Sequence, residues 1–418
     1  MREMKKSGIE WIGEIPKDWK LERLQWHLDE IVEKNDPIVT TQVLSLTNKK
    51  GVIPYEEKGA QGNVAKESYD GYKIAYPNTI VANSMNILIG SVGYSNYYGC
   101  VSPVYYVFKE KENNDLRFIN YIMQTSQFQK ELRRYANGIL EIRLRVSSGN
   151  ILKRICAFPE HNEQSRIADY LDSKCFQIDV IIEKQQAIIE KLKEYKLSLI
   201  SEAVTKGLNK KAELQDSQSD FIGKVPVHWQ IMKFGRCITV KSNLVPPDKY
   251  KSYPQVSPDS IEKSSARLIG FKTVEESGVI SWNHLFYKGQ IIYSKIRPLL
   301  DKVIIAPFDG LCSADMYPIE TTHNPKFIVY MILSAYFHSQ VALVTENRVK
   351  MPKINQNELS NILVAVPPIN EQEIITEWLD RKCELIDKTI RERELLIEQY
   401  NEYKKSLIYE VVTGKKEV

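Results

Sequence analysis

The chain has 418 residues, of which 43% are hydrophobic and 26% charged, and its formal net charge is +4. This length exceeds what one ordinary hydrophobic core holds, so we expect two or more domains. No stretch approaches the roughly 18 consecutive apolar residues of a membrane span, and the charged start of the chain lacks the apolar segment of a signal peptide. We therefore expect a cytoplasmic protein.

The cysteines show no pattern of metal binding, because they form no CxxC pair and have no histidine at ligand spacing. In a cytoplasmic chain of this size they are expected to be reduced and buried. The six are Cys100, Cys156, Cys175, Cys237, Cys312 and Cys383.

A short aromatic turn near the start of the chain returns later as a repeat. Residues 11–19 read WIGEIPKDW and residues 221–229 read FIGKVPVHW, an offset of 210 residues. The fixed glycine and proline predict a turn at the entrance of a domain, with Trp19 and Trp229 as buried side chains. A stronger repeat relates residues 162–205 to residues 370–413 at an offset of 208. So long a period indicates duplication of a whole domain with its connecting segment.

The globular part of each copy mixes strand and helix patterns. In the first copy, strand-like runs at 79–81 and 104–108 alternate with glycine, proline and asparagine turns, and a helical pattern follows near 116–135. The second copy has strand-like runs at 290–293 and 303–305 and then a helical pattern near 325–345. Both parts are predicted to be mixed α+β domains.

A long amphipathic helix is predicted after each globular part. Each helix opens after proline, with Asn162 and Asn370 as the expected N-caps. Apolar residues then recur at alternating spacings of four and three, which predicts a coiled-coil seam. The seam residues are Leu171, Ile178, Ile182, Ile189 and Leu192 in the first helix and Leu379, Ile386, Ile390, Ile397 and Tyr400 in the second.

Polar residues interrupt this seam at matched positions, Gln185 with Arg393 and Lys196 with Lys404. Such residues fix register and partner at a cost in stability, or else their side chains extend from the edge of the seam into water. Two helices that each follow a copy of one domain are expected to pack antiparallel. They would form a spacer on the order of 64 Å long at about 1.5 Å per residue.

Positive charge is concentrated in the globular parts. Residues 20–155 carry a net charge of +4 and residues 230–363 carry +5, whereas residues 156–229 carry −2 and residues 364–418 carry −3. This separation predicts that the domains contact DNA and that the acidic helices contact protein partners.

Basic patches and two loops supply the candidate DNA-contacting side chains. A dense patch at 130–154 recurs in thinner form just before the second helix, and the loop at 91–99 is rich in Tyr, Ser, Gly and Asn, which suits an adaptable contact surface. We align that loop with residues 294–298, where an arginine suits guanine or phosphate. Each group could instead be a solvated surface without a ligand. The candidates are Tyr94, Asn96, Arg133, Arg134, Arg143, Arg145, Lys295, Arg297, Arg348, Lys350 and Lys353.

Common catalytic motifs are missing from the sequence. There is no P-loop, no HExxH and no adenine-methyltransferase signature, and neither Asp248 nor Asp259 is followed by the Glu-x-Lys of a metal-dependent nuclease. Folding could still bring two carboxylates together. We nevertheless expect a binding module without catalytic residues, bound cofactor or metal.

In this duplicated order the motifs resemble the specificity (S) subunit of type I restriction-modification systems. The residues that carry the resemblance are the turns at 11–19 and 221–229, the Pro…Asn-Glu-Gln helix starts at 159–164 and 367–372, and the helix ends at 199–205 and 407–413. The resemblance covers the full chain in the order domain, helix, domain, helix.

The fold implied by the resemblance is α+β, with two mixed target recognition domains separated by an antiparallel pair of long coiled-coil helices and related by a pseudo-twofold internal repeat. The implied segments are recognition domain 1 at residues 1–155, the central helix at 156–210, recognition domain 2 at 211–363 and the C-terminal helix at 364–418. Each domain would read one half of a bipartite, asymmetric DNA target, and the helices would set the gap between the halves.

The implied partners are double-stranded DNA, two methyltransferase (modification) subunits and restriction motor-nuclease subunits. S-adenosylmethionine, ATP and Mg would bind to those partners. Three alternatives stay open: a specificity subunit of a type IIB or IIG-like system, an enzyme that acts alone on DNA, and a coiled-coil scaffold without DNA contact. The missing motifs argue against the lone enzyme, and the separation of charge argues against the scaffold.

Overall fold

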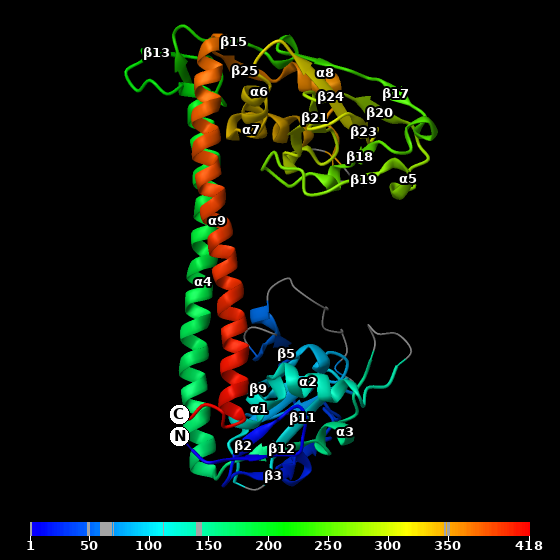
Figure 1. The fold of residues 1–418 in the computed structure, drawn as a ribbon, viewed down its shortest axis with the longest axis vertical. Coiled ribbons are helices and arrows are strands. Elements are labelled where there is room, and N and C mark those ends of the chain that lie inside the picture. The colour runs from blue at the N-terminus through cyan, green and yellow to red at the C-terminus, as the bar shows by residue number, and fades with distance from the viewer. Residues whose placement is uncertain are drawn as a thin grey trace. The chain divides into compact units, whose positions relative to one another are not determined.

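The computed structural model describes residues 2–47, 51–58, 69, 71–111, 113–138, 144–346, 348 and 352–418. The chain divides into two compact units, one made of Met1–Gln185 with Leu395–Val418 and the other of Gln186–Glu394 (Figure 1). Each unit holds one mixed domain and one half of each of two long helices, α4 and α9. The units are described separately below.

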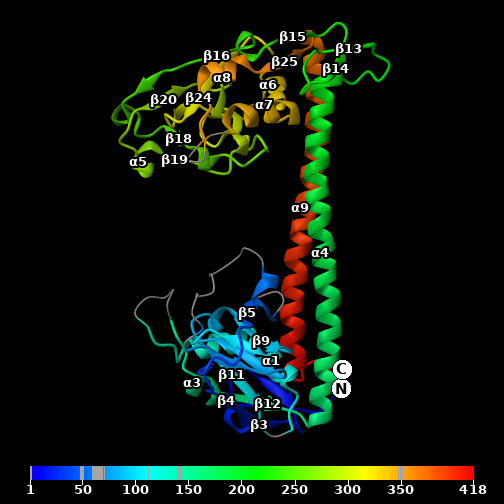
Figure 2. The same ribbon diagram turned by 180° about the vertical axis from the view of Figure 1, so that it is seen from behind.

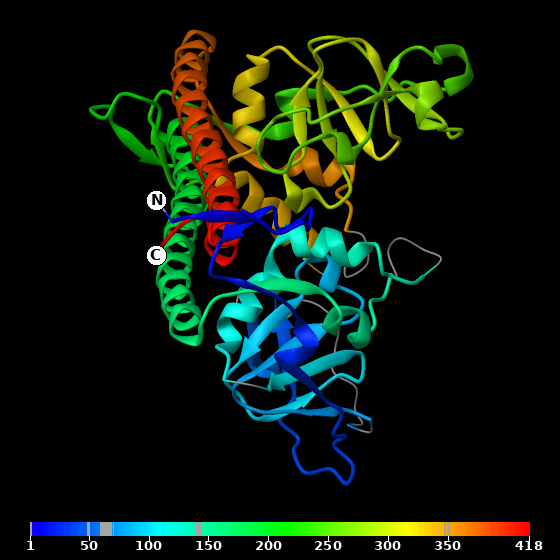
Figure 3. The same ribbon diagram turned by 60° about the horizontal axis from the view of Figure 1, so that its bottom comes forward.

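The domain of the first unit is built on a four-stranded antiparallel sheet in the order β4-β11-β8-β9. Helices α1 and α2 follow β11, and their buried Phe118, Ile119 and Phe128 share one core with Ile80 and Phe108 of the sheet. Figure 3 shows the strands of this unit, in blue and cyan, from below. The bounds are β4 Leu28–Ile31, β8 Thr79–Asn83, β9 Val92–Ser95, β11 Tyr105–Glu110, α1 Leu116–Gln124 and α2 Ser126–Arg133.

Short antiparallel strand pairs complete the first unit, namely β1 with β2, β7 with β10, β5 with β6, and β3 with β12. Helix α3 precedes β12, which leads into α4. Their bounds are β1 Met4–Lys6, β2 Glu14–Pro16, β3 Lys20–Arg23, β5 Leu44–Thr47, β6 Gly51–Pro54, β7 Lys73–Ala75, β10 Gly99–Val101, α3 Ser148–Leu152 and β12 Ile155–Phe158.

The second unit repeats this plan with the antiparallel sheet β16-β24-β21-β22, followed by α6 and α7 (Figure 2). Its core joins Ile291 and Ile319 of the sheet to Phe327, Ile328 and Phe337 of the helices. The bounds are β16 Ile238–Val240, β21 Ile291–Ser294, β22 Val303–Ile305, β24 Met316–Thr321, α6 Pro325–Ile332 and α7 Ala335–Thr345.

A second sheet of five strands, in the order β17-β20-β23-β18-β19, extends this unit. Pairs β13–β14 and β15–β25, with helices α5 and α8, complete it. The bounds are β13 Leu214–Asp216, β14 Lys224–Pro226, β15 Gln230–Lys233, β17 Leu244–Val245, β18 Pro254–Val256, β19 Lys272–Thr273, α5 Val274–Ser277, β20 Asn283–Phe286, β23 Gly310–Cys312, α8 Gln356–Asn361 and β25 Leu363–Val366.

Most local predictions from the sequence are confirmed by these elements. The four strand-like runs form β8, β11, β21 and β22, and the two helical patterns form the pairs α1–α2 and α6–α7. Trp19 and Trp229 are buried, and all six cysteines are buried and unpaired. Within the described residues, no single helix is long and apolar enough to cross a membrane, and only the bent pair α6–α7 meets that test by length and composition.

The long helices begin two residues earlier than the expected N-caps allow. Helix α4 spans His161–Lys206 and α9 spans Ile369–Val412, so Asn162 and Asn370 lie inside the first turn and the N-cap prediction is wrong. The first helical bonds are instead accepted by the carbonyl groups of Glu160 and Pro368. The side chains that fix the start of each long helix are the repeated glutamines, Gln164 and Gln372, and not the asparagines.

Gln164 and Gln372 occupy equivalent buried sites and make equivalent hydrogen bonds. The Nε2 of Gln164 donates to the Pro159 carbonyl (3.1 Å), and its Oε1 accepts from the backbone N–H of Asp115 (3.1 Å), the residue that caps α1. In the second unit, Gln372 donates to the Pro367 carbonyl (2.9 Å) and accepts from the N–H of Asn324 (3.0 Å), which caps α6. One side chain therefore joins the strand end, the long helix and the first domain helix in each unit.

A second matched contact fixes each domain to its long helix. The hydroxyl of Tyr121 donates to Asp172 in α4 (2.6 Å), and that of Tyr330 donates to Asp380 in α9 (2.7 Å). Each carboxylate also binds a cation of the same domain, Arg117 in the first unit (2.8 Å) and Lys326 in the second. Each domain therefore has a defined orientation on the helix to which it is attached.

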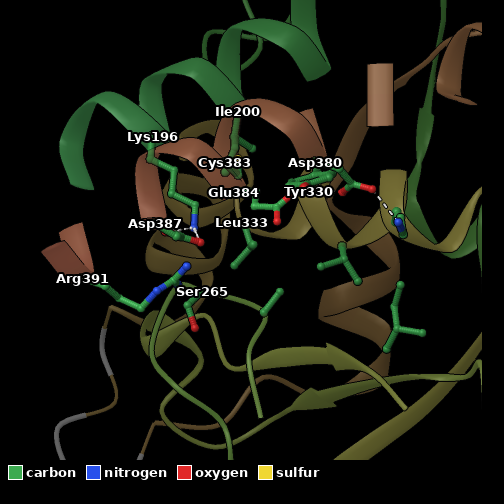
Figure 4. Close-up of a pocket in the computed structure, with 14 residues that line it drawn as sticks. Lys196, Ile200, Ser265, Tyr330, Leu333, Asp380, Cys383, Glu384, Asp387 and Arg391 are labelled. Atoms are coloured by element: carbon green, nitrogen blue, oxygen red, sulfur yellow. Dashed lines mark hydrogen bonds and ion pairs between the residues drawn. The ribbon is translucent and has the colours of Figure 1, made fainter. Parts of the chain in front are cut away.

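Ion pairs set the alignment of α4 against α9 within each unit. In the first unit, Lys404 Nζ lies 2.7 Å from both carboxylate oxygens of Asp179, and in the second, Lys196 Nζ lies 2.8 Å from both oxygens of Asp387 (Figure 4). In an antiparallel pair of helices, residues that face each other have numbers with a constant sum. The two ion pairs have the same sum, so α4 and α9 keep the same antiparallel register in both units. Because the Lys196 side chain is only 11% exposed, it lies inside the helix contact and does not extend into water.

Predicted seam residues lie in this helix contact. Leu171 and Ile178 pack with Leu407 and Val411 in the first unit, and Leu379 packs with Ile200 in the second. Ile189, Ile386 and Ile390 are also buried, whereas Ile182, Leu192, Ile397 and Tyr400 are half-buried.

Replacing Gln372 with alanine should lower the free energy of unfolding of the second unit by about 1–3 kcal/mol, since buried backbone groups of Asn324 and Pro367 lose their partner. Urea unfolding followed by tryptophan fluorescence measures the change. The matched control is Gln356→Ala at an exposed position of α8 in the same unit, which should shift stability by less than about 0.5 kcal/mol. Equal effects of the two substitutions would contradict the anchoring role.

Candidate nucleic-acid interface

The loop that joins the two neighbouring strands at one edge of each four-stranded sheet has the same length in both units and contains one 3-10 helix. The backbone just before that helix differs, with φ −118° at Asn86 and +44° at Arg297. The loop β8–β9 contains the 3-10 helix η3 (Ile87–Ile89), and the loop β21–β22 contains η8 (Pro298–Leu300). Each 3-10 helix ends at a left-handed residue, Gly90 with φ +86° and Asp301 with φ +46°. Because the strand orders correspond, these two loops are structural equivalents.

The segment before α3 or α8 supports each of these loops. The N–H of Val146 donates to the Ser84 carbonyl (3.1 Å), and the N–H of Ile354 donates to the Lys295 carbonyl (2.9 Å). Val146 and Ile354 are fully buried and stand 208 residues apart. The residues just before them, Arg145 and Lys353, are therefore equivalent basic side chains beside equivalent loops.

Four of the predicted residues of the second unit come together around loop β21–β22. The backbone of Ile296 pairs with Lys353, and the N–H of Arg297 donates to the Pro352 carbonyl (2.8 Å). Arg348 joins the group because its guanidinium donates to the Lys353 carbonyl. Lys295 completes it, with Nζ 5.3 Å from the centroid of the Tyr317 ring. Lys350 lies outside the described residues.

Carboxylates already neutralise two of these cations. Lys353 Nζ lies 3.0 Å from Asp315, and Arg348 forms two contacts with Glu358, of which the Nη1–Oε2 contact measures 3.2 Å. The hydrogen bond from Arg348 lowers the pKa of Glu358, so this carboxylate is charged at neutral pH. Arg297 differs, because its exposed side chain contacts no partner among the described residues.

The predicted residues of the first unit do not form one group. Arg145 is exposed beside loop β8–β9, with Nη2 3.7 Å from the Met85 sulfur. Arg133 and Arg134 lie at the end of α2, where Arg134 pairs with Glu10 (2.8 Å) and with Glu131 (3.1 Å). Arg143 lies outside the described residues.

Tyr94 and Asn96 lie at the opposite end of the sheet from loop β8–β9. Tyr94 belongs to β9, and its hydroxyl donates to Asn78 just before β8 (2.6 Å), while Asn96 is exposed in the loop after β9. Burial raises the pKa of the Tyr94 hydroxyl, which stays protonated. The alignment of residues 91–99 with 294–298 is wrong, because β9 corresponds to β22 and the counterpart of 294–298 is 83–87.

Asn86 is the residue that the sequence pattern missed. It occupies the position of Arg297, directly before the 3-10 helix, and it is exposed with no side-chain capping hydrogen bond. Its neighbours Met85 and Ile87 are apolar and hide the position in any search for polar clusters. The offset of 208 between Arg145 and Lys353 was the signal that could have located these loops.

A histidine of α7 holds the end of loop β21–β22. His338 Nδ1 lies 2.8 Å from Asp301 Oδ2, and Asp301 is buried and also accepts from the hydroxyl of Ser264 (3.3 Å). The hydrogen bond with Asp301 raises the pKa of His338 above its ordinary value. This pair therefore joins the candidate surface to the helical layer. Over the described residues, no group of three or more His, Cys, Asp and Glu side chains is placed to hold a metal ion.

Comparison with known sequences identifies the relatives of this chain. Residues 226–399 match the family model described as Type I restriction modification DNA specificity domain. The type I restriction enzyme EcoDI specificity subunit of Escherichia coli is 31% identical over 285 residues, which cover 65% of this chain and 64% of that protein. The putative type I restriction enzyme MjaX specificity subunit of Methanocaldococcus jannaschii is 22% identical, covering 97% of this chain and 95% of that protein. The chain thus spans less than two thirds of the Escherichia coli relative.

Solved structures show the same fold. A chain from work on complex assembly and conformational transition of the type I R-M system has a TM-score of 0.73 at 11% identity, covering 96% of this chain and 99% of that one. The HsdS subunit from Thermoanaerobacter tengcongensis has a TM-score of 0.51 at 10% identity, covering 96% and 98%. The predicted resemblance to type I specificity subunits is confirmed, and so is the predicted fold of two mixed domains with a pair of long helices.

Substituting Lys353 with glutamine should weaken binding of the chain to duplex DNA and reduce the slope of log affinity against log salt by about 0.9, the value for one phosphate contact. Arg145→Gln should act in the same way, since the two residues are equivalent. The affinity for duplex DNA is measured by fluorescence anisotropy at salt concentrations from about 50 to 200 mM, where affinity falls steeply with salt. Lys224→Gln, at an exposed position of β14, is the control. An unchanged slope for both variants would remove these residues from the interface.

Raising the pH should loosen loop β21–β22. Because the folded-state pKa of His338 is raised, its contribution to stability is complete below the ordinary histidine pKa of about 6.5. That contribution disappears as the pH rises through the raised value. Hydrogen exchange of the backbone N–H groups of Leu300 and Asp301, corrected for intrinsic pH dependence, should show protection falling over this range. The variant His338→Gln should show no such step, and a step that persists in it would assign the effect to another group.

Proposed function

We propose that this chain is the DNA-recognition (specificity) subunit of a type I restriction-modification complex. The observation that carries the proposal is that both units contain the same domain, the same attachment to a long helix and the same supported loop. Two domains with the same strand order are each fixed to a long helix by a buried glutamine, and each presents a supported loop beside an equivalent basic residue, Arg145 or Lys353. Matching frameworks with different loops suit two readers of two different DNA half-sites.

Each domain reads one half of a bipartite, asymmetric target in this proposal. The net positive charge of residues 20–155 and 230–363 supplies attraction to the phosphate backbone. Side chains of the supported loops then supply base contacts in the major groove. We retain the division into recognition domains at 1–155 and 211–363 and helical segments at 156–210 and 364–418.

The long helices set the separation of the half-sites and bind the other subunits. Their common register, fixed by Lys196 with Asp387 and by Lys404 with Asp179, suits a spacer of constant length. Exposed Tyr195 and its equivalent Tyr403 recur once in each copy. Two equivalent surfaces fit two copies of a methyltransferase subunit, to which restriction motor-nuclease subunits are added for cleavage.

Chemistry resides in the partners in this proposal. The modification subunits bind S-adenosylmethionine and methylate adenine, and the restriction subunits use ATP and Mg. This chain contributes recognition without catalysis and acts with them in the cytoplasm. A specificity subunit of a type IIB or IIG-like system would do the same with one fused partner, and the composition of the purified complex distinguishes the two.

Co-expression of the chain with its modification subunit, in a host free of other adenine methylation, should produce methylated adenines within one two-part motif with a constant gap. Modification-sensitive sequencing of the host genome checks this result. The chain expressed alone should produce no methylation. Methylation without sequence preference in the co-expressing host, or methylation by the chain alone, would contradict the proposed function.

A further inference from the structure

Resting on the function proposed above, we infer that Asn86 and Arg297 are equivalent base-reading residues. Arg297 of the second unit reads a guanine in one half-site. Asn86 of the first unit reads an adenine in the other half-site, at a position other than the methylated base.

The equivalence of the two residues follows from their surroundings. Asn86 stands two positions after Ser84, whose carbonyl accepts the N–H of Val146, and Arg297 stands two positions after Lys295, whose carbonyl accepts the N–H of Ile354. The matching donors Val146 and Ile354 stand at the same offset of 208 as the repeated helices, whereas the loops between the strands do not keep that offset. The two loops therefore hold different side chains at one position of the framework, and the backbone there differs too, with φ −118° at Asn86 and +44° at Arg297.

Both residues stand on a backbone whose own hydrogen bonds are satisfied. In the first loop, the N–H of Gly90 donates to Ile87 (3.1 Å), and in the second, the N–H of Asp301 donates to Pro298 (3.0 Å). The second loop is also held from outside, because the N–H of Arg297 donates to the Pro352 carbonyl. The backbone of such a loop loses little further freedom on binding, so the ordering cost falls on the side chain alone.

The two side chains are free to bind, unlike most charged groups near them. Asn86 and Arg297 are exposed, and neither side chain forms a hydrogen bond or ion pair within the described parts of the chain. Arg348 and Lys353, by contrast, contact Glu358 and Asp315. Arg297 also has a φ of +44°, a conformation that a glycine would adopt more readily. An arginine kept in this strained conformation is consistent with a role for its side chain.

The chemistry of the two side chains selects their bases. The guanidinium of Arg297 presents two parallel donors that match O6 and N7 of guanine. The amide of Asn86 presents one donor and one acceptor that match N7 and N6 of adenine. The equivalent cations Arg145 and Lys353 lie on the supporting segments beside these loops. In this inference they bind the adjacent phosphates, Lys353 by exchanging its ion pair with Asp315. This division of roles separates base reading from positioning.

The test maps methylated motifs in hosts that express the modification subunit with the wild-type chain, Arg297→Lys or Asn86→Ala. Arg297→Lys keeps the charge and loses the paired donors, so one guanine position in one half of the motif should lose about 5- to 150-fold of its preference. Asn86→Ala should relax one adenine position in the other half. Sites that carry the original motif should remain methylated in both hosts, which shows that each variant folds and assembles.

Arg236→Lys is the matched control, because Arg236 is an exposed residue of the 3-10 helix η5 (Phe234–Arg236), which precedes β16 at the opposite end of the same sheet. It should leave the motif unchanged. An unchanged motif for Arg297→Lys, or a uniform loss of methylation at every site, would overturn the assignment of Arg297. For Asn86→Ala, an unchanged motif or a uniform loss of methylation would likewise overturn the assignment of Asn86. A wild-type chain that directs no selective methylation would instead reject the proposed function itself.

Discussion

Two buried glutamine side chains, Gln164 and Gln372, hold the architecture together. Each amide satisfies a proline carbonyl at the end of one strand and a backbone N–H at the start of a domain helix, where little water could replace it. A buried backbone group without a partner is costly, so the long helix, the strand and the domain must meet in one geometry. The orientation of each domain on its helix depends on this contact.

From these anchors the rest of each unit follows in sequence. The long helices align through Lys196 with Asp387 and Lys404 with Asp179, pairs that satisfy a charge at a partly buried seam. The four-stranded sheet then places one edge loop beside the segment before α3 or α8. Rigid parts of the repeat thus position the parts that differ. A protein that reads two different half-sites with one framework needs this division.

The candidate surface shows why charge counts alone describe a binding site poorly. Arg134, Arg348 and Lys353 each contribute to the basic excess, yet each already contacts a carboxylate of its own domain. Arg297 contributes the same single charge and has no such contact with any residue that the structure describes. A cation with an internal partner must exchange it for phosphate or base, whereas a free one gains the whole interaction. Whether a basic side chain already has a carboxylate partner therefore distinguishes the candidate DNA-binding residues better than net charge does.

The sequence by itself determined the duplication, the strand and helix content of both domains, the buried tryptophans and the seam of the long helices. These features depend on local periodicity and on a repeat that is visible without coordinates. Only the tertiary structure decided that Gln164, not Asn162, fixes the helix start, and that Asn86, not Tyr94 or Asn96, is the counterpart of Arg297. The physical reason is that both decisions rest on hydrogen bonds between segments distant in the chain. The residues that neighbour a side chain in sequence do not show which distant backbone group it will bind.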